Sequence, residues 1–205
     1  YTREAAGAPW RVIVMSADGS RAEAVTSADL DAGEAVWSPG GDRLAFMYRH
    51  WGTTEPWRLS ILDLRTRKLS DLPGTEGWGY PGWSPDGRFL LARRVGVNGL
   101  ALYSFADQRW RTIPSPALSG PFWSPDGRSI YFNTLGDAQP GIYRIQVGGG
   151  GVPSFSAAQE LVDLRGFLPT GTYGNWSGLA PDGSFLLLRY IGASAIYRFD
   201  WSAPR

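Results

Sequence analysis

The pentapeptide Trp83-Ser84-Pro85-Asp86-Gly87, followed by the apolar run Phe89 to Ala92, is one of four near copies of a single phrase. The others are Trp37-Ser38-Pro39-Gly40-Gly41, Trp123-Ser124-Pro125-Asp126-Gly127 and Leu179-Ala180-Pro181-Asp182-Gly183. Their first residues are 46, 40 and 56 positions apart. A period of this size is typical of stacked supersecondary units, so the phrase decides the architecture.

Each copy of the phrase predicts two strands joined by a tight turn. Pro suits an early turn position because its ring fixes φ, Asp hydrogen-bonds the backbone that follows it, and Gly accepts a positive φ. The Trp anchors the strand before the turn, and the apolar run forms the strand after it. We expect residues that recur in every unit to build the unit, which leaves function to the residues that do not recur.

A second phrase recurs five times with spacings of 47, 43, 40 and 54 residues, and it predicts a third strand in every unit. A polar turn and a weaker strand follow it, as in residues 22–26 and 68–72. The five copies are Val12-Ile13-Val14-Met15, Leu59-Ser60-Ile61-Leu62, Leu102-Tyr103-Ser104-Phe105, Ile142-Tyr143-Arg144-Ile145 and Ile196-Tyr197-Arg198-Phe199.

Four antiparallel strands repeated about every 45 residues are the pattern of β-propeller blades. We therefore predict an all-β fold, a single propeller domain over residues 1–205 with about four blades, part of a ring of six to eight. The predicted parts are a partial blade at 10–27, blades at 34–72, 80–114 and 120–164, and a last blade at 172–201.

The two ends of the chain allow two interpretations. Residues 22–26 could pair beside Ile196 to Phe199 and close a ring, which would remove an exposed sheet edge. That pairing would leave Val12 to Met15 as a surplus third strand. We therefore favour residues 10–27 as the end of a blade whose beginning is missing, which makes the chain the C-terminal portion of a longer propeller.

Composition sets broad limits on function. Twenty basic and nineteen acidic residues give a net charge of +1, without the basic excess that marks nucleic-acid binding. No apolar stretch reaches the roughly 20 residues of a membrane-spanning helix, so we expect no membrane insertion by this segment. The chain has no Cys, which excludes disulfides and thiolate catalysis.

The Trp-Ser-Pro-Asp-Gly turn followed by an Ile-Tyr-x-apolar strand resembles the repeats of TolB-like propellers of bacterial periplasmic proteins, over residues 10–201. The stretch 178–201 looks like the C-terminal end of propellers attached to bacterial regulators or kinases. The resemblance implies a sensor or docking domain outside the cytoplasm, with an output domain preceding it. Gly40 in place of Asp, and Leu179-Ala180 in place of Trp-Ser, depart from the pattern.

Residues that recur in every blade are interpreted as structural. Asp86, Asp126 and Asp182 could ring a hard cation, but a turn role explains them better, and we predict no metal or cofactor site. Trp37, Trp83 and Trp123 are expected to pack between neighbouring sheets. The single histidine, His50, has no nucleophile context, so we predict a surface or aromatic-packing role and no catalytic residues.

Residues outside the repeat pattern are candidates for an interaction surface; the default interpretations are that the aromatic side chains cover the ends of blades and that the arginines are solvated surface residues. Aromatic side chains in loops or where strands begin suit contacts with a protein or peptide, and the three arginines at the ends of second strands are expected on one face, where they could pair with an acidic partner segment. The long segment 148–176 is a further candidate loop. The candidates are Arg49, Trp51, Trp78, Tyr80, Arg93, Arg94, Phe167, Tyr173 and Trp176.

Three functions remain open from the sequence. We favour a non-catalytic propeller for protein interaction or sensing, within a larger bacterial regulatory or envelope protein. The first alternative is the accessory propeller of a prolyl-peptidase-like hydrolase. The second is a propeller that binds a small ligand or metal through its channel.

Overall fold

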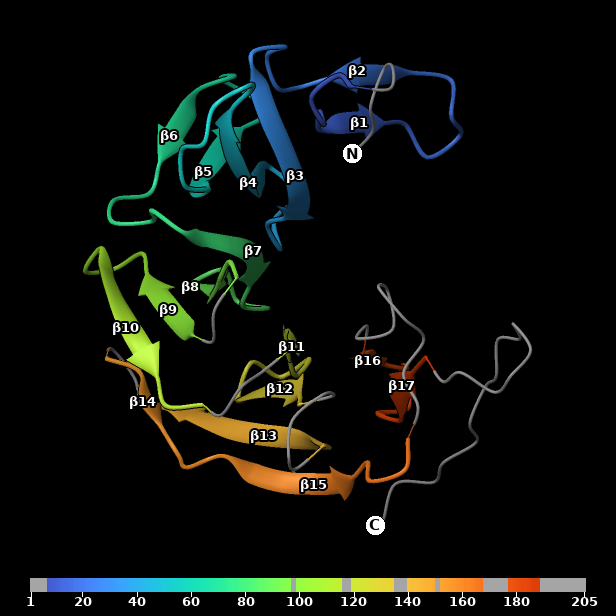
Figure 1. The fold of residues 1–205 in the computed structure, drawn as a ribbon, viewed down its shortest axis with the longest axis vertical. Coiled ribbons are helices and arrows are strands. Elements are labelled where there is room, and N and C mark those ends of the chain that lie inside the picture. Colours follow the sequence, from blue (N-terminus) through green and yellow to red (C-terminus); the bar gives the residue numbers. More distant parts are fainter. Residues whose placement is uncertain are drawn as a thin grey trace. The chain divides into compact units, whose positions relative to one another are not determined.

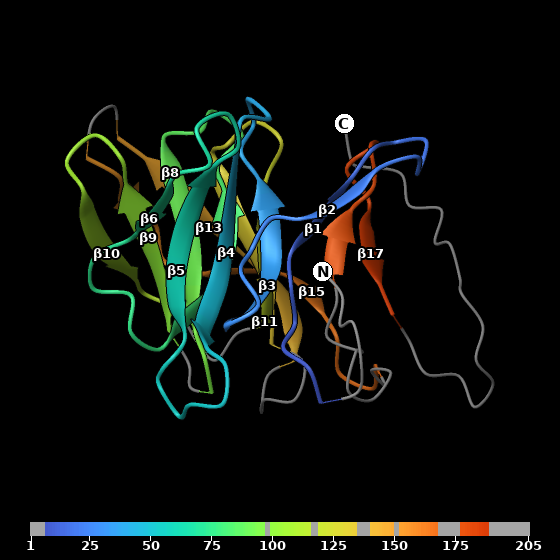
Figure 2. The ribbon, with the colours of Figure 1, turned by 90° about the horizontal axis from the view of Figure 1, so that it is seen from above.

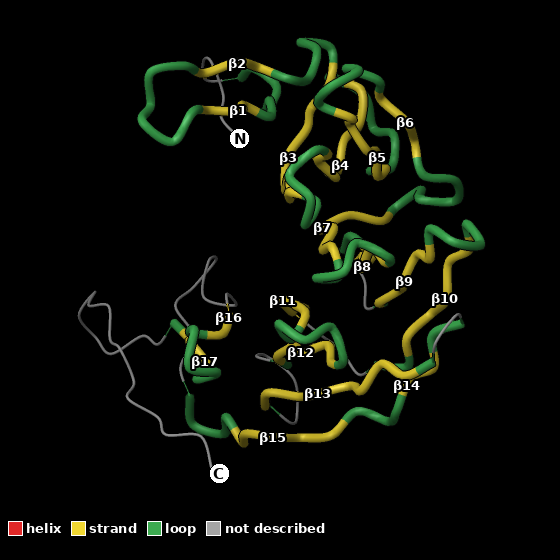
Figure 3. Tube along the Cα trace, turned by 180° about the vertical axis from the view of Figure 1, so that it is seen from behind, coloured by secondary structure: helices red, strands yellow, loops and turns green. Residues whose placement is uncertain are grey.

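In the computed structural model, the residues described are 7–96, 99–115, 119–134, 140–149, 152–167 and 177–188. They form β-strands and loops and contain no helix (Figure 3), so no described segment could cross a membrane as a helix. The chain divides into two compact units, Tyr1–Ile113 and Pro114–Arg205, which are described separately.

The first unit contains one hairpin and two four-stranded antiparallel sheets (Figure 1). The hairpin is β1 (Ile13–Met15) with β2 (Ala22–Ala24). Sheet one is β3 (Leu30–Trp37), β4 (Arg43–His50), β5 (Arg58–Asp63) and β6 (Leu69–Asp71). Sheet two is β7 (Trp78–Trp83), β8 (Phe89–Arg94), β9 (Leu100–Ser104) and β10 (Arg109–Ile113). Within the hairpin and within each sheet, every strand pairs with the next in the chain, and Figure 2 shows β3, β4 and β5 side by side.

The second unit contains sheet three and a terminal hairpin. Sheet three is built from β11 (Ser119–Trp123), β12 (Ser129–Asn133) and β13 (Gly141–Gly148), with β14 (Ser154–Phe155) and β15 (Gln159–Asp163) both pairing with the long β13. The hairpin is β16 (Ser177–Leu179) with β17 (Phe185–Leu187). Strands β14 and β15 lie within the segment 148–176, which the sequence analysis gave as a candidate recognition loop. This part of the segment therefore forms the outer edge of a sheet.

A buried hydroxyl organises the recurring turn. In sheet two the Ser84 hydroxyl donates to Asp86 Oδ1 at 2.7 Å and accepts the Phe89 N–H at 2.9 Å. The same Asp86 oxygen accepts the Arg88 N–H at 3.0 Å, and Gly87 has a φ of 71°. Sheet three repeats this network around Ser124. The turn thus satisfies its own polar groups and fixes the register of the two strands that it joins.

The two copies that depart from the phrase, at Gly40 and at Leu179-Ala180, keep part of the hydrogen-bond network of the turn. Where Gly40 replaces the aspartate, the Ser38 hydroxyl donates instead to Asp42 Oδ1 at 2.9 Å, so the carboxylate is supplied two positions later. In the terminal hairpin Ala180 has no hydroxyl, but Asp182 still accepts the Ser184 N–H at 2.9 Å. The hairpin β1–β2 uses the full network around Ser16 and Asp18, which the phrase did not flag.

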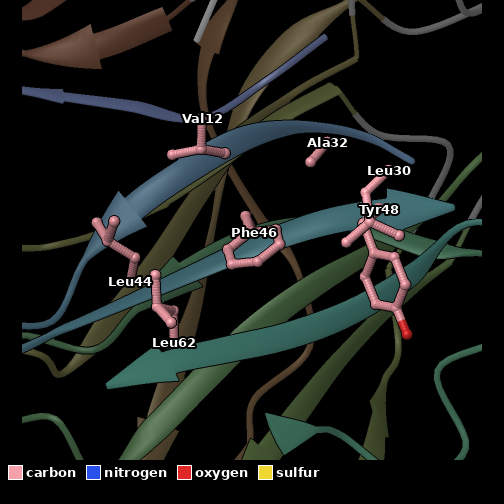
Figure 4. Packing of buried hydrophobic residues seen from close by; sticks show 7 residues of the cluster. All are labelled: Val12, Leu30, Ala32, Leu44, Phe46, Tyr48 and Leu62. Carbon is pink, nitrogen blue, oxygen red and sulfur yellow. The ribbon is translucent and has the colours of Figure 1, made fainter. Parts of the chain in front are cut away.

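Strand β4, an inner strand of sheet one, is buried on both faces. Leu44, Phe46 and Tyr48 pack with Val12 of the N-terminal hairpin, as Figure 4 shows, while Ala45 and Met47 pack toward sheet two. This two-sided burial explains why β4 reads as a continuous apolar run without polar alternation. Stacked sheets that share cores in this way are what the repeat predicted.

The signature tryptophans do not all pack as expected. Trp83 stacks on Phe105, with ring centroids 5.0 Å apart and planes within 9°. Trp37 is instead 51% exposed. Leu64 occupies the position in sheet one that Phe105 occupies in sheet two. The Leu64 N–H donates to the carbonyl of Asp42, just before β4, and the Phe105 N–H donates to the carbonyl of Arg88, just before β8. Sheet one therefore has no ring at the position where Phe105 stacks on Trp83.

Replacing Ser84 by Ala tests the turn network. The change leaves the buried Phe89 N–H without its acceptor, so we expect a loss of about 1–3 kcal/mol in the free energy of unfolding. Urea unfolding followed by tryptophan fluorescence measures it. Ser16→Ala is the matched control, because the same network there is exposed and water replaces the hydroxyl. Equal losses for the two variants would contradict the role of burial.

The turn carboxylates predict a dependence of stability on acid. Hydrogen bonds from the Ser124 hydroxyl and the Arg128 N–H hold the pKa of Asp126 below its ordinary value of 3.8. A lowered folded-state pKa gives stability that is present above the unfolded-state pKa and is lost as the pH falls through the folded value. We expect thermal stability of the wild type to approach that of Asp126→Asn as the pH falls below about 4. A difference between the two that is constant from pH 7 to pH 2 would refute this.

Candidate functional site

The two ends of sheets one and two carry different groups of residues. At one end lie the signature turns; these neighbour each other, since a Cβ placed on Gly87 would lie 3.8 Å from Pro39. At the opposite end, the loop end, Leu30 pairs with His50 in sheet one and Trp78 pairs with Arg94 in sheet two. Antiparallel pairing therefore places the first residues of β3 beside the last residues of β4, and the first residues of β7 beside the last residues of β8.

Three arginine side chains each lie over an aromatic ring at the loop end. The Arg93 guanidinium carbon is 4.1 Å from the Tyr80 ring centroid, the Arg49 carbon is 4.5 Å from Trp57, and the Arg94 carbon is 5.3 Å from Trp78. Such cation–π contacts contribute about 0.5–1 kcal/mol each at exposed sites. We call these six residues the arginine–aromatic face.

A buried carboxylate anchors one end of this face. Asp31 is 3% exposed; its Oδ2 accepts the Arg49 Nη2 at 3.3 Å, and its Oδ1 accepts the Trp10 N–H at 3.0 Å. The Trp10 carbonyl in turn accepts the Ala32 N–H at 2.8 Å. Asp31 therefore ties β3, β4 and the chain before β1 together, and it neutralises Arg49.

Beside the face lies a cavity of about 200 Å³, lined by Trp10, Ala32, Gly33, Glu34, Met47, Trp57 and Tyr80. Two of these residues have left-handed backbones: φ is 51° at Glu34 and 53° at Tyr80. Both lie in bulges, where the pairing register shifts between Gly33 and Val36 and between Gly79 and Gly82. The bulges direct the inner strands of both sheets toward one cavity.

The predicted surface residues separate into three groups. The structure brings together Arg49, Trp78, Tyr80, Arg93 and Arg94 at the loop end of the first unit. Trp51 follows β4 and is 41% exposed, and its N–H donates to the Asp29 carbonyl. Phe167 lies in the second unit, where its N–H donates to the Leu164 carbonyl. Tyr173 and Trp176 lie outside the described residues.

Sequence reasoning did not include Trp10, Trp57, Glu34 and Met47 among the site residues. A signal for Trp10 was present, because Pro9-Trp10-Arg11 before one third strand repeats as Pro56-Trp57-Arg58 before the next. The two tryptophans occupy equivalent positions, since Thr26 Oγ1 accepts the N–H two residues after Trp10 and Thr75 Oγ1 accepts the N–H two residues after Trp57. Glu34 carried no sequence signal of its own.

The residues weighed as catalytic or metal-binding make local contacts. His50, the last residue of β4, lies exposed at the loop end, with its Nδ1 3.0 Å from Glu55 Oε2 and its ring edge-on to Tyr48. Asp86 and Asp126 accept hydrogen bonds within their own turns. Among the described residues, acidic and histidine side chains form no cluster of three or more that could hold a metal.

A larger cavity of about 750 Å³ lies in the second unit at the signature end, between sheet three and the terminal hairpin. Two of its charged residues pair locally: Asp126 accepts the Ser124 hydroxyl, and Arg144 donates to Gln159 at 2.7 Å. We therefore favour the loop end of the first unit as the candidate site.

Comparison with solved structures identifies the architecture. TolB from Acinetobacter baumannii aligns with a TM-score of 0.63 at 20% sequence identity, over 89% of this chain and 43% of TolB. The chain has a β-propeller fold. It is a partial propeller of about four blades and spans less than half of TolB, and the predicted fold class is confirmed.

Two further solved structures that align with this chain have different functions in their names. An auxiliary nutrient binding protein from Bacteroides thetaiotaomicron aligns with a TM-score of 0.56 at 11% identity, over 88% of this chain and 42% of that one. Oligogalacturonate lyase from Vibrio parahaemolyticus aligns with 0.54 at 14% identity, over 68% and 42%. No family model and no curated protein sequence matches the chain. At these identities the similarity shows the propeller fold alone.

The Asp31 anchor gives a prediction about stability. Asp31→Ala removes the acceptor of both Arg49 and the Trp10 N–H, so we expect a loss of about 2 kcal/mol in the free energy of unfolding. Asp31→Asn keeps one oxygen for the Trp10 N–H and should lose about half as much. Urea unfolding read by tryptophan fluorescence distinguishes them. Equal losses would show that the Trp10 contact contributes nothing.

Proposed function

We propose that this chain is a non-catalytic propeller segment that binds a protein or peptide partner through the arginine–aromatic face. The observation that carries the proposal is the set of three arginine–aromatic pairs at one end of two adjacent sheets. Trp, Tyr and Arg are the residue types that dominate binding energy in protein interfaces.

The geometry supports binding in two further ways. Stacking holds the rings and guanidinium groups in place before a partner arrives, which lowers the conformational entropy lost on binding. Among the described residues, no carboxylate forms an ion pair with Arg93 or Arg94, so both retain hydrogen-bond donors for a partner. The Nε atom of Arg93 is buried and has no hydrogen-bond acceptor among the described residues.

The wider role follows from the resemblance to TolB-like propellers. It supports a sensor or docking module within a larger bacterial protein, located outside the cytoplasm in the periplasm. The presence of a lyase among the structural neighbours makes catalysis the alternative to exclude. Cleavage of oligogalacturonate by the purified chain would contradict the non-catalytic part of the proposal.

Selection from a displayed random-peptide library on the immobilised chain tests the binding role. We expect selected peptides to bind the wild type and to lose at least about tenfold in affinity to the double variant Arg93→Ala/Arg94→Ala. Arg88→Ala is the matched control, because Arg88 also lies over an aromatic ring, Phe89 at 5.4 Å, but beside a signature turn. Failure to select any peptide, or equal losses for both variants, would overturn the proposal.

A further inference from the structure

Another cavity, of about 380 Å³, lies between sheets one and two of the first unit. Its lining includes Arg43 and Asp63, which pair where β4 begins and β5 ends, so it lies at the end of the signature turns. Tyr103 lines it from β9 of sheet two. Sites for small molecules measure about 300–1,000 Å³, so this cavity has room for one. The arginine–aromatic face lies at the opposite end of the same sheets.

Tyr103 occupies a position that is aliphatic in sheets one and three. In each of the three sheets, this residue of the third strand pairs with the residue six positions after the signature serine. The equivalent residues are Leu62 in sheet one and Ile145 in sheet three, which are 3% and 0% exposed. Packing at this position therefore needs only an apolar side chain, and of these three sheets only sheet two adds a hydroxyl.

The Tyr103 hydroxyl has no partner in the described part of the chain. The side chain is 4% exposed, and its ring centroid lies 5.1 Å from that of Phe105 and 5.0 Å from that of Trp110. No described residue forms a hydrogen bond with the hydroxyl. Burial raises the pKa of Tyr103, so the group stays protonated and can donate at neutral pH. A buried hydroxyl without a partner costs free energy that leucine would avoid, and beside a cavity this indicates a ligand.

Contacts within and between the two sheets hold the walls of the cavity in place. The Trp110 Nε1 in β10 donates to the carbonyl of Pro73, shortly after β6, at 2.9 Å, and so joins the outer strands of both sheets. The N–H and the hydroxyl of Thr66 donate to Asp63 Oδ1 at 2.7 and 2.8 Å, which fixes the turn between β5 and β6. Pro73, Thr66 and Asp63 all line the cavity. A site formed in advance loses little conformational entropy when a ligand binds.

Three further polar side chains of the lining are free to bind a ligand. Lys68, Ser70 and Gln108 form no side-chain hydrogen bond or ion pair with a described residue. Together with Tyr103 they offer an ammonium group, an amide and two hydroxyls. The ammonium group only donates hydrogen bonds, whereas the amide and the hydroxyls both donate and accept. The cavity can therefore satisfy a ligand that carries donors and acceptors side by side.

The formal charges of the lining cancel, because Arg43 and Lys68 balance Asp63 and Asp71. The net charge therefore favours neither a polyphosphate nor a polycation. Phe105 adds an apolar surface to the lining. Neutral sugars match both properties, since their C–H faces are apolar and each of their hydroxyls donates and accepts a hydrogen bond.

We propose that this cavity binds a neutral sugar of one or two rings, with the Tyr103 hydroxyl and the Lys68 ammonium group donating to sugar oxygens. Ser70 and Gln108 bind further hydroxyls, and Phe105 contacts a C–H face of the ring. Donation from the charged ammonium group is the stronger of these hydrogen bonds. The site goes beyond the proposed function, because it uses other residues at the other end of the sheets.

Saturation-transfer NMR on the whole chain tests the site with five neutral probes: glucose, galactose, N-acetylglucosamine, lactose and cellobiose. We expect at least one to bind with a dissociation constant on the order of 1 mM. Lys68 is the single lysine of the chain, so slower acetylation of its side chain in the presence of that sugar reports on this cavity directly. Absence of binding by all five, or tighter binding of the acidic digalacturonate than of any neutral probe, would overturn the proposal.

Two variants remove one donor each. Tyr103→Phe deletes only the hydroxyl, and Lys68→Met replaces the ammonium group on an exposed side chain; each should weaken sugar binding about tenfold. Neither should lower the thermal midpoint, because neither group has a partner among the described residues. The matched control is Tyr143→Phe. Tyr143 is 8% exposed, but its hydroxyl lies 3.4 Å from Glu160 Oε2 and it does not line the cavity, so this variant should lose stability and keep sugar binding.

Unchanged sugar binding in both Tyr103→Phe and Lys68→Met would reject the site, and a lower midpoint for Tyr103→Phe with unchanged binding would assign its hydroxyl to folding. The double variant Arg93→Ala/Arg94→Ala should bind the sugar as the wild type does. Sugar binding without selection of any peptide would leave this site standing and reject the proposed function. Peptide binding through Arg93 and Arg94 without sugar binding would do the reverse.

Discussion

A buried serine hydroxyl accepts the first N–H of one strand while it donates to an aspartate, and the rest of each sheet depends on this pair of hydrogen bonds. Ser84 and Ser124 form it with almost the same distances. A shift of one residue in the register would turn every side chain of a strand to the other face. By fixing the register, the turn determines which residues of β4 enter each of two cores, and where the inner-strand bulges lie.

The sequence was sufficient to predict the architecture because the turn chemistry is local. Pro, Asp and Gly at fixed positions encode the hairpin without reference to the rest of the chain. The same reasoning misjudged positions that depend on neighbours in space. Asp42 replaces the aspartate missing at position 40, and Trp37 is exposed, with Leu64 at the position where sheet two has Phe105. Neither substitution can be recognised before the strands are paired.

The candidate site was predictable in part, for the same reason. The repeat placed Arg49, Arg93 and Arg94 at equivalent strand ends, which indicated one face. It could not show which ring each guanidinium covers, nor that Trp10, distant in sequence, would line a cavity with Tyr80. The left-handed positions were hidden because Glu34, Tyr80 and Gly120 share no side-chain property; only their distance from the tryptophan is common.

The separation of the two ends of each strand has a consequence for how such a protein can change. β3 has eight residues and is therefore about 26 Å long, with the hydrogen-bonded turn just beyond one end and the cavity-lining residues Ala32, Gly33 and Glu34 in its middle. Mutations near the cavity leave the turn that sets the register untouched. The residues that line the cavity can therefore change one sheet at a time, by exchange of a single residue, without a new fold being required.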